Sequence, residues 1–129
     1  MVEWKETPQF LKFKKEFILS FNDRYKTLCD VNVNNINNND ISSILDMCHQ
    51  VAGIAETYDF LSLGKICAIS ESFLDDFLSN QSKNSKTMLD DLISLLKDSF
   101  LLASKGIDPV EIYQDPSMKK IKDLVEAGC

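Results

Sequence analysis

The fold is decided by residues 41–78, which read ISSILDMCHQVAGIAETYDFLSLGKICAISESFLDDFL. Apolar side chains recur there every three or four positions, the spacing that places them on one face of an α-helix. Two such patterns follow each other, so we expect one helix from about Ile41 to Glu56 and another from about Ser62 to Leu78. Because the connection between them is short, the two helices should lie antiparallel and pack against each other.

A further helical pattern precedes this pair. Thr7 is a suitable N-cap and Pro8 suits the first position of a helix. The apolar residues that follow recur on one stripe: Phe10, Phe13, Phe17, Phe21, Tyr25 and Leu28. The helical spacing is then interrupted by the run VNVNNINNND, residues 31–40. Because asparagine side chains compete for backbone hydrogen bonds and favour turns, this run predicts a loop that ends with Asp40 as the next N-cap.

A fourth helical pattern follows the break that we expect at residues 80–85, NQSKNS. Its inner face comprises Met88, Leu92, Leu95, Leu96, Ser99 and Leu102. It should end near Gly106, since glycine readily adopts the left-handed conformation that closes many helices. Asp115 and Pro116 then form a second pair of cap and proline and predict a short helix in the tail. The sequence therefore predicts an all-α protein, an antiparallel up-down-up-down four-helix bundle with an additional short C-terminal helix.

Length and composition limit the possible functions. The 129 residues predict one domain, 1–129, with a core of about 7–106 and a tail of 107–129. Fourteen basic and twenty acidic residues give a net charge of −6, which argues against nucleic acid as a partner. No run of about 18 apolar residues is present, so we expect a cytoplasmic protein without membrane insertion. The four cysteines, at positions 29, 48, 67 and 129, form no CxxC pair and predict free thiols.

His49 is the only histidine in the chain, so it is the only imidazole that can act as a neutral nitrogen nucleophile near pH 7. With a turn of about 100° per residue, His49 lies at the edge of the buried face of its helix, next to Cys48. A side chain at this edge is anchored beside the core and open to solvent. From its position alone, a half-exposed histidine without a function is an open alternative.

Residues near His49 favour a functional interpretation. Gly53 lies one turn further on; a helical glycine costs about 1 kcal/mol relative to alanine, but its missing side chain lets another protein approach the ring. Glu71 lies at the equivalent edge of the next helix, and for one hand of the hairpin its carboxylate accepts the second ring N–H of His49. That bond would leave the other ring nitrogen as a nucleophile; the alternative for Glu71 is a solvated carboxylate. Gly64 and Ala68 would keep this side of the helix shallow.

This set of residues resembles the motif of the histidine phosphotransfer family. The family pattern is a histidine, an apolar residue two positions later, a glycine four later and a small residue six later, then threonine with an aromatic residue and a second aromatic residue. The chain matches this pattern after His49 with Val51, Gly53, Ala55, Thr57, Tyr58 and Phe60. The similarity extends more loosely from about Phe10 to Leu102 and so covers the four-helix pattern.

The resemblance implies a phosphorelay intermediate, not an enzyme. His49 would be the phosphoacceptor, Gly53 would give the partner access, and Glu71 would bond the imidazole ring. The implied partners are response-regulator receiver domains and a hybrid sensor histidine kinase. The protein would need no cofactor and no metal of its own, since the divalent metal is expected on the receiver domain. We expect it to be a monomer.

The chain departs from the family pattern in three places. Ala52 stands where many members carry a lysine that helps to neutralise the phosphoryl group, and Glu56 and Asp59 replace frequent glycines and add negative charge. Slower transfer or a narrower choice of partners would follow. One alternative is a degenerate family member, a helical adaptor that binds receiver domains without being phosphorylated. A metal or haem site on His49 and Cys48 is disfavoured, because neighbouring side chains on a helix point about 100° apart.

Overall fold

The computed structural model describes residues 7–79 and 86–127, and these residues form helices and no strand. In chain order the elements are α1 (Pro8–Cys29), η2 (Val33–Asn35), α2 (Asn38–Ile54), η3 (Ala55–Tyr58), α3 (Leu61–Ser79), α4 (Lys86–Ser104), α5 (Val110–Tyr113) and α6 (Pro116–Ala127). The predicted all-α class is confirmed for these residues, whereas the predicted break at 80–85 lies outside them. None of the helices in the described ranges combines the length and the hydropathy needed to cross a bilayer.

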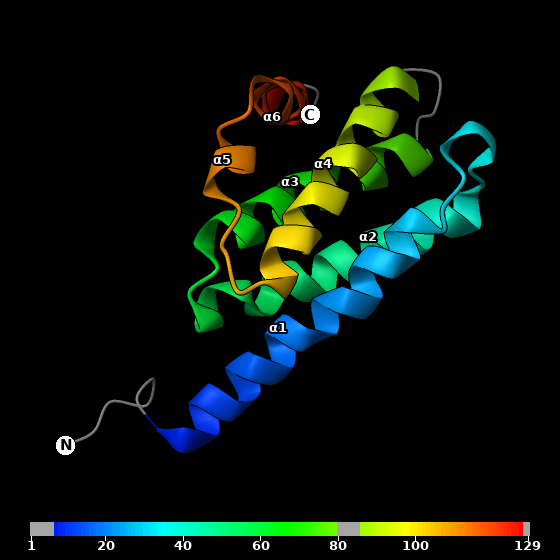
Figure 1. The fold of residues 1–129 in the computed structure, drawn as a ribbon. Coiled ribbons are helices and arrows are strands. Elements are labelled where there is room, and N and C mark those ends of the chain that lie inside the picture. The colour runs from blue at the N-terminus through cyan, green and yellow to red at the C-terminus, as the bar shows by residue number, and fades with distance from the viewer. Residues whose placement is uncertain (1–6, 80–85, 128–129) are drawn as a thin grey trace.

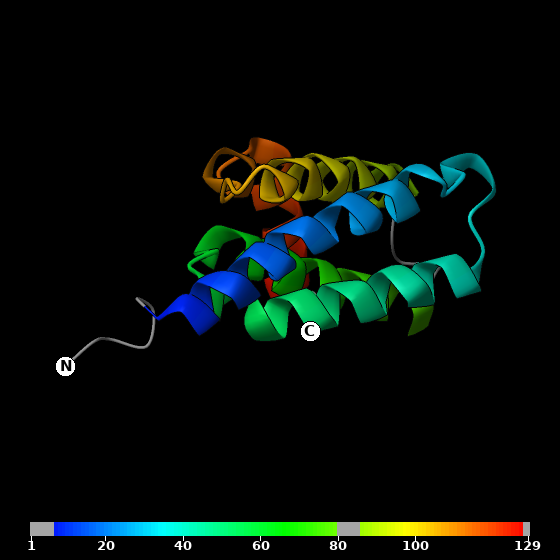
Figure 2. The same ribbon diagram turned by 60° about the horizontal axis from the view of Figure 1, so that its bottom comes forward.

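The four long helices run alternately in opposite directions (Figures 1 and 2). α2 packs along α3, and α1 packs along α4. α6 runs across the others, since it is seen end-on in Figure 1 where α1 to α4 are seen from the side, and it packs on α3 and α4. This arrangement is compatible with the predicted four-helix bundle, and it places the final helix on the α3 and α4 side of the molecule.

One hydrophobic core joins all the long helices and the tail. Its largest fully buried side chains include Phe21 from α1, Phe73 from α3 and Phe100 from α4, and Met118 and Ile121 of α6 belong to the same cluster. Residues of the tail are therefore part of the core. The predicted free thiols are confirmed at positions 29, 48 and 67, while position 129 lies outside the described residues. Burial raises the pKa of the Cys67 thiol well above its usual range.

The predicted apolar stripe of α1 is wrong at Phe13, whose side chain is 38% exposed. Phe10, Phe17 and Phe21 are buried as predicted, and Tyr25 is half-buried. With a turn of about 100° per residue, Phe17 and Phe21 lie within about 20° of Phe10, whereas Phe13 lies about 60° away. The step of three residues thus places Phe13 outside the narrow arc that α1 buries.

The predicted start and end of α2 also need correction. Its N-cap is Asn37, not Asp40: the Asn37 side chain accepts a hydrogen bond from the Asp40 backbone N–H at 2.8 Å, and the Asp40 carboxylate accepts one from the Asn37 N–H at 3.4 Å. This reciprocal capping box lets the helix begin inside the asparagine-rich run. At the other end, α2 stops at Ile54 instead of Glu56 and continues as the tighter turn η3.

The other predicted helix ends are confirmed. The Thr7 hydroxyl accepts a hydrogen bond from Phe10 N–H at the start of α1, and the Asp115 carboxylate accepts one from Ser117 N–H at the start of α6. After α4, Gly106 has a left-handed φ of 79°. The Gly106 N–H donates a hydrogen bond to the Ala103 carbonyl, and the Ile107 N–H donates one to the Leu102 carbonyl. This pair of bonds is the Schellman motif.

The start of α3 is capped from a distant part of the chain. Asp108, in the connection between α4 and α5, accepts hydrogen bonds from the backbone N–H groups of Ser62 at 3.1 Å and Leu63 at 2.9 Å. A carboxylate here satisfies two donors that the helix itself cannot use and interacts favourably with the positive end of the helix dipole. Asp108 therefore ties the tail to the helix that carries Glu71.

Replacing Asp108 with alanine should lower the free energy of unfolding by about 2 kcal/mol, because two hydrogen bonds to a charged acceptor at a helix N-terminus are lost. Urea denaturation followed by circular dichroism measures this change. Asp91→Ala, at an exposed position of α4, is the matched control and should change stability by about 0.5 kcal/mol or less. Equal stability of the two variants would contradict the capping role.

Candidate functional site

His49 lies within α2 with its side chain 73% exposed. The residue before it, Cys48, and the residue two positions after it, Val51, are both fully buried. The helix is thus held against the core on one side while the imidazole projects from its edge. This placement agrees with the boundary position predicted from the helical periodicity.

Glu71 of α3 holds the imidazole in place. The distance from His49 Nδ1 to Glu71 Oε1 is 2.7 Å, and the Glu71 side chain is 32% exposed. Since an ionised carboxylate only accepts hydrogen bonds, Nδ1 is the protonated ring nitrogen in this contact. The neutral ring then has its lone pair on Nε2. The structure therefore contains the predicted contact between His49 and Glu71, with an exposed ring presented to solvent.

Towards its N-terminal end, α3 faces the turn after α2 with a small residue, Gly64. A Cβ atom placed on Gly64 would lie 3.5 Å from the Cβ atom of Ala55, the first residue of η3, which is ordinary van der Waals contact. Further along α3, the buried Ser70 hydroxyl donates to the Ile66 carbonyl at 2.7 Å, so its own donor is satisfied within the helix.

Gly53 is exposed, and a Cβ atom added to it would have no other atom within 4 Å. No contact within the described chain therefore requires a glycine at this position. Ala52 is half-buried against the core, and Ala68 on α3 is exposed. Gly53 and Ala68 thus add little side-chain bulk to the exposed surfaces of α2 and α3, whereas Gly64 is half-buried next to Ala55.

One of the two additional acidic residues near the site has a cationic neighbour. Asp59 Oδ2 lies 3.7 Å from Lys14 Nζ of α1. Both acidic side chains, Asp59 and Glu56, are exposed to solvent. Asp59 also has a left-handed φ of 68°, a conformation in which a glycine is less strained. Lys14 was not among the predicted site residues, because only the folded chain brings α1 next to the turn after α2.

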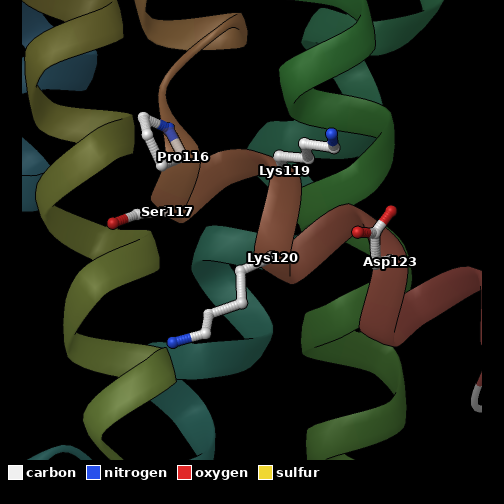
Figure 3. A pocket seen from close by; sticks show the side chains of 5 residues that line it. All are labelled: Pro116, Ser117, Lys119, Lys120 and Asp123. Atoms are coloured by element: carbon white, nitrogen blue, oxygen red, sulfur yellow. The ribbon is translucent and has the colours of Figure 1, made fainter.

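The surface pocket shown in Figure 3 lies on α6 and is lined by Pro116, Ser117, Lys119, Lys120 and Asp123. His49 does not belong to its lining. In the described part of the chain, no group of three or more histidine, cysteine, aspartate or glutamate side chains is placed to hold a metal ion.

The structure therefore brings His49 and Glu71 into contact at the edges of α2 and α3, with the exposed Gly53 one turn further along α2. It also reveals Asp108, which the sequence analysis did not connect with the site. Comparisons with models of known protein families, with characterised proteins and with solved structures found no match. The sequence motif and the geometry around His49 are therefore what points to a function.

Proposed function

We propose that this protein is a histidine phosphotransfer protein, in which His49 accepts a phosphoryl group from an aspartate of one receiver domain and passes it to another. The single observation that carries the proposal is the imidazole itself, 73% exposed and bonded through Nδ1 to Glu71 at 2.7 Å. An exposed, oriented nitrogen nucleophile is what transfer between two proteins requires.

In the proposed step, the His49 Nε2 lone pair attacks the phosphorus of an aspartyl phosphate. The bond from phosphorus to the aspartate oxygen breaks, and the carboxylate leaves with the electron pair. The new N–P bond makes the ring cationic while the proton remains on Nδ1. The Glu71 carboxylate lies 2.7 Å from Nδ1 and stabilises this positive charge. The reverse step on a second receiver regenerates the neutral ring.

The antiparallel helices form, in this proposal, a four-helix bundle whose α2 and α3 edge is the docking surface. The partners are response-regulator receiver domains and a hybrid sensor histidine kinase, and the protein acts as a cytoplasmic monomer. A divalent metal on the receiver supplies the charge that stabilises the transferring phosphoryl group. The protein contributes position and nucleophile, so it has no kinase activity of its own.

The experiment that tests the proposal is incubation of the protein with receiver domains carrying a radiolabelled phosphoryl group on aspartate. The expected product is a labelled protein whose label is lost in acid and stable in base, the behaviour of an N–P bond. Binding to receivers without any label would instead favour the helical adaptor. If the protein neither acquires the label nor binds the receiver domains, the proposal is overturned.

Replacing Glu71 should slow transfer, because the carboxylate both orients the ring and stabilises its charge. We expect Glu71→Ala to reduce the transfer rate by about 10- to 100-fold, and Glu71→Gln, which keeps an acceptor oxygen without the charge, by about 10-fold. Thermal stability should change by about 1 kcal/mol or less, since the pair is exposed. Rapid-quench measurement of the label gives the rates, and an unchanged rate for Glu71→Ala would remove Glu71 from the mechanism.

A further inference from the structure

The two helices that form the His49 site are strongly acidic. α2 and α3 carry five acidic residues, Asp40, Asp46, Glu71, Asp75 and Asp76, and a single basic residue, Lys65. With Ala52 in place of a lysine, α2 has no lysine or arginine. The whole chain has a net charge of −6, so an acidic partner would be repelled unless a local positive surface attracts it.

Lys65 belongs to a cationic cluster built around Tyr113 of α5. Lys65 Nζ lies 5.4 Å and Lys122 Nζ of α6 lies 5.8 Å from the centroid of the Tyr113 ring. Lys122 also donates a hydrogen bond to the Tyr113 hydroxyl at 3.5 Å. Both distances fall within the range of cation–π attraction. Three separate elements thus converge to hold two ammonium groups on one aromatic ring, and we call these three residues the Tyr113 cluster.

Within the described parts of the chain, the two ammonium groups have no acidic partner. Among residues 7–79 and 86–127, no carboxylate lies within ion-pair distance of Lys65 or Lys122. Lys119, on the preceding turn of α6, projects towards α3 as well (Figure 3). A chain with an excess of acidic residues therefore keeps two positive charges together and available to a partner.

The Tyr113 cluster borders the same helix face as the histidine. On α3, Lys65, Ala68 and Glu71 are three residues apart, so each step turns about 60° around the helix and six residues advance about 9 Å along it. Ala68 lies between the other two and is exposed. The exposed face of α3 thus runs from the contact between Glu71 and His49 to Lys65 and the edge of α6. A protein seated over His49 and Ala68 would reach the cluster.

We propose that the Tyr113 cluster is an electrostatic docking site for the acidic surface of the receiver domain that binds over His49. This inference rests on the proposed function. A receiver that presents an aspartate together with oxygen ligands for a divalent metal has carboxylates at its reactive face. The cluster attracts such a surface beside the reacting atoms and offsets the repulsion from α2 and α3. Its main effect is on the rate of association.

The test reverses both lysine charges in the variant K65E/K122E. The control variant K86E/K105E makes the same change in net charge at two exposed positions at the ends of α4. Both are built on H49Q so that binding is measured without transfer, and the probe is a Mg²⁺-loaded receiver domain that labels His49 in the transfer assay. In stopped-flow measurements at low salt, K65E/K122E should associate about ten-fold more slowly than the control, and the difference should shrink at high salt.

The outcomes separate this inference from the proposed function. Equal association rates for the two double variants, together with labelling of His49 in the wild-type protein, would overturn the docking site alone. Absence of both labelling and binding in the wild-type protein would overturn both proposals. Lysine-dependent sedimentation with phosphatidylserine vesicles, with unchanged receiver association, would assign the cluster to a lipid surface and overturn the protein partner.

Discussion

His49→Gln should abolish the acid-labile label that we expect the wild-type protein to acquire from a phosphorylated receiver domain. His49 is the only histidine in the chain, so no second imidazole can replace it. Glutamine retains a polar side chain of similar reach, but its amide nitrogen has no available lone pair for attack on phosphorus. We expect the labelled fraction to fall at least about 100-fold, which corresponds to about 2.7 kcal/mol in the barrier. Gel electrophoresis at neutral pH with phosphorimaging measures the label.

The fold should survive this substitution, which makes the result interpretable. The His49 side chain is mostly exposed, and its one described polar contact is the exposed pair with Glu71, so unfolding by urea should shift by about 1 kcal/mol or less. Binding of receiver domains should also persist in the variant. An acid-labile label of wild-type intensity on His49→Gln would contradict the assignment of the phosphoacceptor.

The contact between His49 and Glu71 could be predicted because it depends on local rules. The periodicity of α2 and α3 places each residue at the edge of a buried face, and a short connection makes the two helices neighbours. The periodicity alone is compatible with either hand of the helical hairpin. The structure has the hand in which the edges that carry His49 and Glu71 meet. The result is the 2.7 Å contact between His49 Nδ1 and Glu71 Oε1, which a helical wheel of a single helix does not contain.

The contributions of the tail could not be predicted in the same way. Asp108 bonds backbone groups 45 and 46 residues earlier in the chain, and Lys65 meets Lys122 only through Tyr113. These contacts depend on how α5 and α6 pack across α3, which side-chain periodicity does not determine. The wrong N-cap at Asp40 has a local cause: an asparagine-rich run favours turns, but its last residues also form a capping box that starts a helix.

Substitutions of Gly53 should raise the stability of the fold and lower the rate of phosphoryl transfer. A Cβ atom there meets nothing within 4 Å, and the residue lies in the last turn of α2 with an ordinary helical conformation. Gly53→Ala should therefore raise the free energy of unfolding by about 0.5 to 1 kcal/mol, because alanine loses less backbone entropy in a helix. Gly53→Leu should retain most of this gain, since the larger side chain has open space to occupy.

The rate of phosphoryl transfer should fall as the side chain at position 53 becomes larger. A leucine at position 53 projects from the exposed edge one turn after His49 and prevents a receiver domain from bringing its aspartate within the roughly 3 to 3.5 Å that the reaction requires. We expect Gly53→Leu to transfer at least about ten-fold more slowly, and Gly53→Ala to lie between it and the wild type. Ser94→Leu, at an exposed position of α4, is the matched control and should transfer at the wild-type rate. Transfer by Gly53→Leu at the rate of this control would mean that the partner does not approach over Gly53. A Gly53 variant with a higher free energy of unfolding and a lower transfer rate would show that the glycine is needed for binding of the partner and not for the stability of the fold.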